Sequence, residues 1–210
     1  MSVSLSASRA LVTGASGGIG MAIARALHAR GATVVATARR QEVLDGLRAD
    51  LGDRLEVVKA DLADRADVAA LPDRAGRVDV LVANAALPAS GAFDDFSGEE
   101  VDRALDVNLR APLHLARELA KPMVGRGSGH LVFISSLSGK AASPGGSLYS
   151  ATKFGLRGFA LGLREDLAGT GVGVTTVSRA SSATPACSTR AAPTCPRAWA
   201  RGRRTTSPPG

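Results

Sequence analysis

Apolar residues in the first 178 positions follow two alternating patterns. Short runs of consecutive apolar residues are typical of strands buried on both faces, and longer segments with apolar residues every three or four positions are typical of helices with one buried face. Strands that alternate with helices favour a parallel sheet. We therefore predict one α/β domain over residues 1–178, a doubly wound parallel sheet with a layer of helices on each face.

The predicted strands are Ala10–Thr13, Thr33–Thr37, Leu55–Val58, Val78–Ala83, His130–Ile134 and Val172–Val177. The predicted helices are Gly18–Ala29, Gln41–Leu51, a short one at Arg65–Leu71, a long one at Ser97–Met123 and Leu148–Ala168. Ser97 and Glu100 have the spacing of a capping box, which marks the start of the long helix.

Residues 179–210 break this pattern. They are rich in Ser, Thr, Pro, Ala and Arg without apolar periodicity, and so have the composition of a disordered tail. Six of the 26 basic residues and no acidic residue lie there, so the net charge of +7 comes mostly from the tail. The tail has no Phe or Tyr to stack on bases, and a nucleic-acid binder is therefore the weakest function class considered.

Composition argues against several other classes. No run of about 18 apolar residues could span a membrane, and residues 1–9 lack the basic and apolar segments of a secretion signal. We expect a cytoplasmic protein with no membrane partner. Both cysteines lie in the tail and the three histidines are far apart in the sequence, so we expect no disulfide in the domain and no metal site.

Glycines cluster between the first predicted strand and the first predicted helix, in the segment TGASGGIG over 13–20. Glycine permits backbone angles and close approaches that a Cβ would block. The first turn of a helix offers unpaired N–H groups and the positive end of the helix dipole, where a pyrophosphate binds well. A glycine-rich turn in this strand–turn–helix context predicts a dinucleotide-binding site.

The second predicted strand ends in Thr37-Ala38-Arg39-Arg40. An acidic residue at this place would bind the adenosine ribose hydroxyls of NAD, and none is present. The guanidinium of Arg39 can instead pair with the 2′-phosphate of NADP through parallel hydrogen bonds. The alternative is that these arginines form only the solvated start of the next helix.

Four polar residues are candidates for chemistry. Tyr149 and Lys153 are four apart on a predicted helix and share one face, Ser136 follows the fifth strand, and Asn108 lies inside a helix that it does not favour. A phenol has a pKa near 10, which a neighbouring ammonium lowers. We therefore expect Lys153 to lower the pKa of Tyr149, which then exchanges a proton with a substrate oxygen. The alternative is a packed tyrosine beside a solvated lysine.

Together these motifs resemble those of the short-chain dehydrogenase/reductase (SDR) family. The spacing T-G-x-x-x-G-x-G fits residues 13–20, and the order Asn, Ser, Tyr-x-x-x-Lys fits the four candidates, with the serine thirteen residues before the tyrosine. The resemblance covers about Ser6 to Ser178 and implies a Rossmann-type fold. It also implies an oxidoreductase that transfers a hydride between NADP(H) and a small carbonyl or alcohol substrate.

The resemblance implies a role for each residue. Tyr149 is the acid/base, Lys153 holds the nicotinamide ribose, Ser136 bonds the substrate oxygen and Asn108 anchors a water. Ala38 stands where NAD-preferring members carry an acid, so NAD is the less favoured cofactor. The implied cofactor-binding residues are Gly14, Ser16, Gly18, Ile19, Gly20, Arg39, Asp61, Leu62, Asn84, Tyr149 and Lys153. Ala86 departs from the family, which has glycine there in its Asn-Ala-Gly motif.

The resemblance ends after Ser178. Family members continue with a Pro-Gly turn, a substrate-covering segment, a further helix and a last strand, and these include elements of the interface in a family that is usually homo-oligomeric. Two functions therefore stay open at this point. The chain is an NADP-dependent carbonyl reductase or alcohol dehydrogenase, or it is a truncated remnant that binds the cofactor without turnover.

The abrupt change at residue 179 leads us to predict that the tail is the product of a frameshift. Read one base out of phase, the codons of Arg179 and Ala180 are compatible with Pro-Gly. If Ser181 and Ser182 use codons that begin with TC, the corresponding codons in the shifted frame end in TC and can encode only Phe, Leu, Ile or Val. Resequencing the gene should reveal a shifted frame that encodes a dehydrogenase-like C-terminus. An intact frame through codon 178, with no such sequence one base out of phase, would contradict this and favour a true basic tail.

Overall fold

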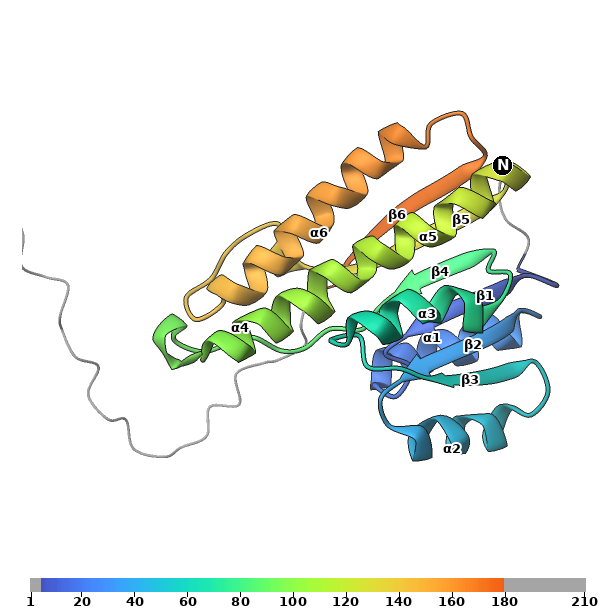
Figure 1. The fold of residues 1–210 in the computed structure, drawn as a ribbon, viewed down its shortest axis with the longest axis horizontal. Coiled ribbons are helices and arrows are strands. Elements are labelled where there is room, and N and C mark those ends of the chain that lie inside the picture. The colour runs from blue at the N-terminus through green and yellow to red at the C-terminus, as the bar shows by residue number, and fades with distance from the viewer. Residues whose placement is uncertain (1–4, 180–210) are drawn as a thin grey trace, which may run out of the picture.

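The computed structural model describes residues 5–179, which form a six-stranded parallel sheet. The strand order is β3-β2-β1-β4-β5-β6, so the chain moves from the centre to one edge and then to the other (Figure 1). This is the predicted doubly wound α/β fold of the Rossmann type. The strands are β1 (Arg9–Thr13), β2 (Thr33–Ala38), β3 (Leu55–Lys59), β4 (Val80–Ala83), β5 (Gly129–Ser136) and β6 (Val172–Arg179).

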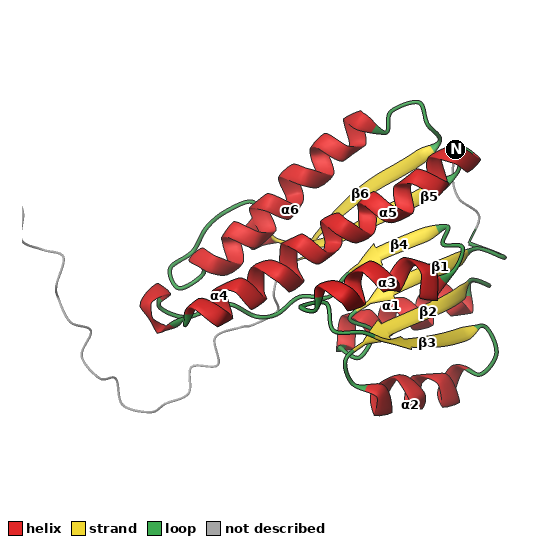
Figure 2. Ribbon diagram, in the orientation of Figure 1, coloured by secondary structure: helices red, strands yellow, loops and turns green. Residues whose placement is uncertain are grey.

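Helices cover both faces of the sheet, as Figure 2 shows. They are α1 (Gly18–Ala29), α2 (Gln41–Leu51), α3 (Arg65–Ala75), α4 (Gly98–Leu105), α5 (Ala111–Arg126) and α6 (Ser147–Asp166). A π-helical segment, η2 (Asp106–Arg110), joins α4 to α5, and two short 3-10 helices are η1 (Phe93–Asp95) and η3 (Leu137–Gly139). Between residues 5 and 179, no helix is long and apolar enough to cross a membrane.

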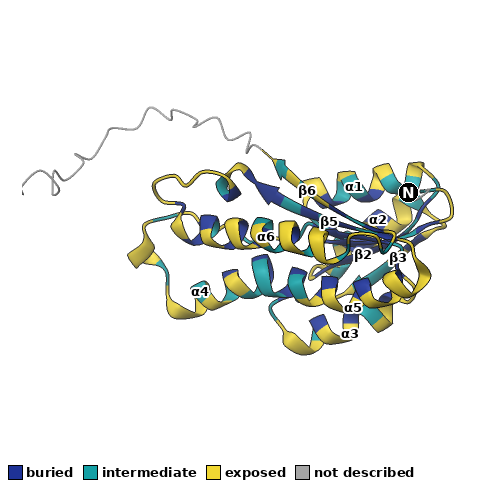
Figure 3. Cartoon of the chain, turned by 90° about the horizontal axis from the view of Figure 1, so that it is seen from above, coloured by how far each residue is buried: buried dark blue, intermediate teal, exposed yellow. Residues whose placement is uncertain are grey.

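Two apolar clusters hold the helices on the sheet. Leu44 of α2 packs with Val12 and Val34 on one face, and Leu115 of α5 packs with Leu11 and Leu81 on the other. Neighbouring residues of β1 thus belong to opposite clusters, because side chains alternate along a strand. In Figure 3 the buried residues accordingly gather along the strands and on the helix faces that are turned toward them.

Two predicted helices differ from the structure by more than two residues. The helix predicted to end at Leu71 continues past Pro72 to Ala75, because Leu71 and Ala75 are both fully buried in the core. The helix predicted as one piece from Ser97 is divided into α4, η2 and α5. It does begin at the predicted capping box, in which Ser97 and Glu100 bond each other's backbone.

The last described strand also extends further than predicted. β6 includes Arg179, which pairs in register with Ser136 of β5 and is the first residue assigned to the tail. The predicted disorder of the tail, and the absence of the family's last strand, concern residues 180–210, which lie outside the described part of the chain.

Candidate active site

A cleft of about 890 Å³ opens along the carboxyl edge of the sheet. The loops after β1 to β5 and the start of α6 line it, because the carboxyl ends of parallel strands meet at one edge. All predicted cofactor-binding residues line this cleft, as do Ser136, Tyr149 and Lys153. Asn108 does not line it. The structure therefore brings the predicted site residues together, with that one exception.

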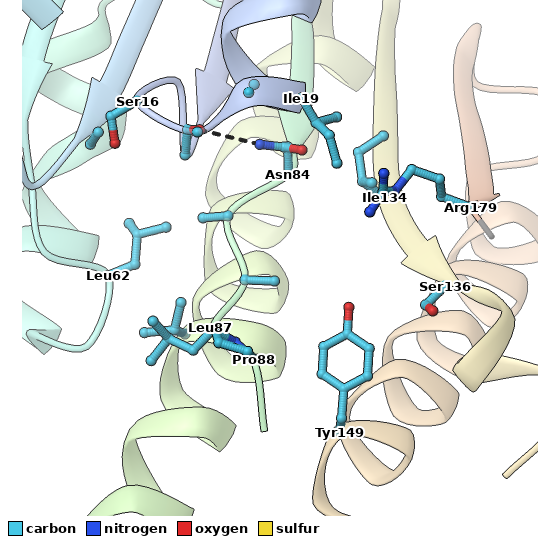
Figure 4. Close-up of a pocket in the computed structure, with 18 of the residues that line it drawn as sticks. Ser16, Ile19, Leu62, Asn84, Leu87, Pro88, Ile134, Ser136, Tyr149 and Arg179 are labelled. Carbon is cyan, nitrogen blue, oxygen red and sulfur yellow. Dashed lines mark hydrogen bonds between the residues drawn. The ribbon is translucent and has the colours of Figure 1, made fainter. Parts of the chain in front are cut away.

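The glycine turn depends on contacts too close for any side chain. Gly14 has φ +68°, and a Cβ on Gly20 would come within 2.2 Å of the Gly14 carbonyl oxygen. The turn is bonded to the end of β4, since Asn84 Nδ2 donates to Thr13 O at 2.9 Å and to Gly14 O at 3.4 Å. Figure 4 draws one of these bonds from Asn84 to the turn. In the described structure no side chain caps the start of α1, which leaves its N–H groups directed toward the cleft.

The end of β2 brings two arginines and a threonine to the cleft. Arg40 Nη2 donates to Ser16 O at 2.7 Å and so joins this strand end to the glycine turn. Arg39 is exposed and makes no hydrogen bond or ion pair within residues 5–179. Thr37 Oγ1 is buried without a hydrogen-bond partner in the same part of the chain. An oxygen-rich ligand with negative charge would pair with the exposed guanidinium of Arg39.

Asp61 and Leu62 line the cleft after β3, as predicted. Asp61 Oδ1 accepts from the Ala63 N–H at 3.0 Å, and Asp61 Oδ2 accepts from Arg103 Nη2 at 2.9 Å. Partial burial alone would raise the pKa of Asp61. The hydrogen bonds from Ala63 and Arg103, with the charges of Arg103 and Arg39, outweigh it and lower this pKa below its usual value.

The first turns of α6 position the tyrosine and lysine. The hydroxyl of Tyr149 points toward Ser136 at the end of β5 (Figure 4). Lys153 is 2% exposed, and its Nζ donates to Ile134 O at 3.0 Å and lies 5.5 Å from the centroid of the Tyr149 ring. The three side chains therefore come from adjacent elements and share one end of the cleft.

The electrostatics of this pair differ from our expectation. Burial raises the pKa of Tyr149, while the Ser136 hydroxyl and the charge of Arg179 act in the opposite direction without overcoming it. Burial also lowers the pKa of Lys153 to about 8. The prediction that the ammonium of Lys153 lowers the pKa of Tyr149 is thus wrong for this structure, because desolvation acts on both groups and disfavours both charged forms.

Asn108 is fully buried in η2, where the preceding residue, Val107, lines the cleft. Its Oδ1 accepts from the Leu87 N–H at 2.6 Å, and its Nδ2 donates to Leu87 O at 2.9 Å. Asn108 therefore holds the loop after β4 against the α4–α5 helices. This explains an asparagine within a long helical segment, although it does not test the proposed bond to a water.

Several residues that line the cleft were not predicted from the sequence. Leu87, Pro88, Ser90 and Ser143 lie in loops, where no periodicity marks them, and Arg179 lay in the segment assigned to the tail. In the part of the chain that the structure describes, no three His, Cys, Asp or Glu side chains gather as metal ligands do.

Comparison with known sequences places this geometry in a family. The sequence pattern of the family described as short chain dehydrogenase matches residues 8–193, a range that runs past Ser178 into residues outside the described structure. "Nodulation protein G" of Rhizobium sp. (strain N33) is 44% identical over 168 residues, which cover 78% of this chain and 69% of that protein. "NADP-dependent 3-hydroxy acid dehydrogenase YdfG" of Escherichia coli (strain K12) is 39% identical over 176 residues, which cover 80% and 69%.

Solved structures give the same result. A short-chain dehydrogenase from Streptomyces avermitilis matches with a TM-score of 0.78 and 42% identity, over 84% of this chain and 66% of that one. A short-chain dehydrogenase from Sphingobium yanoikuyae in complex with NADPH matches with a TM-score of 0.79 and 36% identity, over 82% and 71%. The chain thus spans about two thirds of the length of these proteins.

Substitution of Gly20 should test the close contact in the glycine turn. We expect Gly20→Ala to lower the free energy of unfolding by about 1–3 kcal/mol, because the new methyl group overlaps a backbone carbonyl that cannot move freely. Gly18→Ala is the matched control. A Cβ there meets nothing within 4 Å, so stability should change by less than about 1 kcal/mol. An equal loss of unfolding free energy in the two variants, measured by chemical denaturation, would contradict the close contact predicted at Gly20.

Proposed function

This chain belongs to the short-chain dehydrogenase family, and on that basis we propose that it is an oxidoreductase that transfers a hydride between NADP(H) and a small carbonyl or alcohol substrate. The observation that carries the proposal is that Ser136, Tyr149 and Lys153 line the same cleft as the glycine turn. A dinucleotide bound along this cleft would reach from α1 to α6, and its nicotinamide supplies or accepts the hydride.

The residues of the cleft fit NADP better than NAD. Arg39 lines the cleft at the end of β2 and supplies an exposed guanidinium without a partner in the described chain, which could bind the extra phosphate of NADP. Ala38 offers no carboxylate to bind the ribose hydroxyls of NAD. Two of the similar proteins are described as NADP-dependent or as an NADPH complex, which supports the same choice.

We assign the proton transfer to Tyr149. The pKa of a tyrosine is ordinarily near 10 and burial raises that of Tyr149 further, so the hydroxyl is protonated at neutral pH and can donate to a substrate oxygen that becomes an alcohol. Ser136 would hold that oxygen beside the tyrosine. Lys153, with a pKa of about 8, is mostly charged at pH 7 and would bind the nicotinamide ribose. In the reverse direction the phenolate must take the proton, so alcohol oxidation should become faster as the pH rises.

The alternative function suggested by the sequence is a truncated remnant that binds the cofactor without turnover. The comparisons do not favour it, since the similar proteins with described activities are dehydrogenases. Turnover on a panel of carbonyl substrates, measured beside NADPH binding, separates the two functions.

Tyr149→Phe should lower turnover by at least about 100-fold, because it removes the proton donor and leaves the ring in place. NADPH binding, followed by its fluorescence, should stay within about threefold of the parent. Ser138→Ala is the matched control, since it removes another hydroxyl from the same cleft and should leave turnover nearly unchanged. A Tyr149→Phe variant whose turnover is within tenfold of the parent would refute the role of Tyr149.

The residues at the end of β2 should determine whether NADPH or NADH binds more tightly. We expect the wild type to bind NADPH at least about tenfold more tightly than NADH, because the 2′-phosphate pairs with a guanidinium. The double variant Ala38→Asp, Arg39→Leu should reverse this preference, since a carboxylate binds ribose hydroxyls and repels the phosphate. Fluorescence titration of both cofactors measures the two ratios. Tighter binding of NADH by the wild type would show that the interpretation of β2 is wrong.

A further inference from the structure

One carboxylate lies among the arginines that line the cleft. Asp61 is the only acidic residue in the lining within residues 5–179, and it faces the same cleft as Arg39. The pairing of β2 with β3 brings Asp61 and Arg39 close together, because Ala38 of β2 lies opposite Lys59 of β3. Arg39 directly follows Ala38, and Asp61 lies two residues after Lys59. The charge of Arg39 accordingly lowers the pKa of Asp61.

Such a carboxylate is a problem for a 2′-phosphate site. A free Asp61 would pair with Arg39 and also repel the phosphate group. The structure avoids this arrangement, since Arg103 Nη2 bonds Asp61 Oδ2 at 2.9 Å while Arg39 makes no bond in the described residues.

Asp61 is held in this position from three sides. Its own N–H donates to Asp67 Oδ2 at 2.8 Å, and its Oδ1 accepts from the Ala63 N–H. The third contact comes from Arg103 on α4, next to Ala104, which packs in a small cluster with Leu148 of α6. Arg103 therefore reaches Asp61 from a helix that is itself anchored beside the tyrosine-bearing helix.

We propose that Arg103 is a positioning residue that sets cofactor specificity: by pairing with Asp61 it keeps this carboxylate away from Arg39, which stays available for the 2′-phosphate. The inference rests on the proposed binding of NADP(H). It concerns the ratio of the two affinities, because any contact of Asp61 with the shared part of the dinucleotide affects both cofactors, whereas only NADPH carries the phosphate that a freed Asp61 would repel and Arg39 would bind.

Dissociation constants of NADPH and NADH, measured by fluorescence titration, test the inference without any turnover. Arg103→Gln should weaken NADPH binding about tenfold and NADH binding less than about threefold. Arg103→Lys should keep most of the wild-type ratio because the charge remains. Arg25→Gln is the matched control, since Arg25 forms a comparable ion pair with Asp50 at 2.6 Å outside the cleft.

A double variant makes the test specific. In an Asp61→Asn background no carboxylate remains to be held, so adding Arg103→Gln should leave the NADPH-to-NADH ratio within about threefold of Asp61→Asn alone. This comparison also serves if the single variant Arg103→Gln folds poorly. Thermal unfolding of each variant identifies such a loss of fold.

The outcomes separate the inference from the proposed function. A selective loss of NADPH binding that disappears in the Asp61→Asn background supports the role of Arg103. An unchanged ratio, equal weakening of both cofactors, or the same loss in that background overturns it and leaves Arg103 a structural residue. A wild type that binds neither cofactor overturns the proposed function itself, and the inference with it.

Discussion

Hydrogen bonds between the ends of β1 and β4 hold the centre of the cleft in shape. Thr13 Oγ1 accepts from the backbone N–H groups of Asn84 and Ala85, each at 3.0 Å, and the Asn84 amide returns bonds to the backbone of the glycine turn. These two strands are neighbours at the point where the strand order reverses. The position of the α1 N-terminus in the cleft depends on this junction.

The two ends of the cleft are supported in different ways. At the end near Arg39 and Asp61, charged side chains from separate loops and helices meet at the surface, so their geometry depends on pairing among the charges. At the end near Tyr149, buried contacts dominate. Lys153 bonds the backbone of β5, and Asn108 bonds the backbone at Leu87, so two polar side chains inside the protein fix the walls around Tyr149.

Local patterns in the sequence were sufficient for much of this fold. α1 and α2 begin and end as predicted, since their apolar periodicity and flanking turns lie within about a dozen residues. Contacts between distant residues could not be predicted in this way. The Arg103–Asp61 pair joins positions 42 residues apart, and the raised pKa of Tyr149 depends on burial that only the assembled fold creates. Pro72 within α3 shows the same limit, because core packing overrides a residue that usually ends helices.

The π-helical segment η2 determines how far α4 is rotated about its axis relative to α5. A π turn holds one residue more than an α turn, so it changes the rotation of the helix before it relative to the helix after it. Regular α-helix over the same residues would turn α4 by about 100° about its axis, the angle of one residue. Arg103 would then face away from Asp61 while α5 stayed on the sheet. This single extra residue therefore sets the angle between the side chains of the helix that carries Arg103 and those of the helix that packs on the sheet.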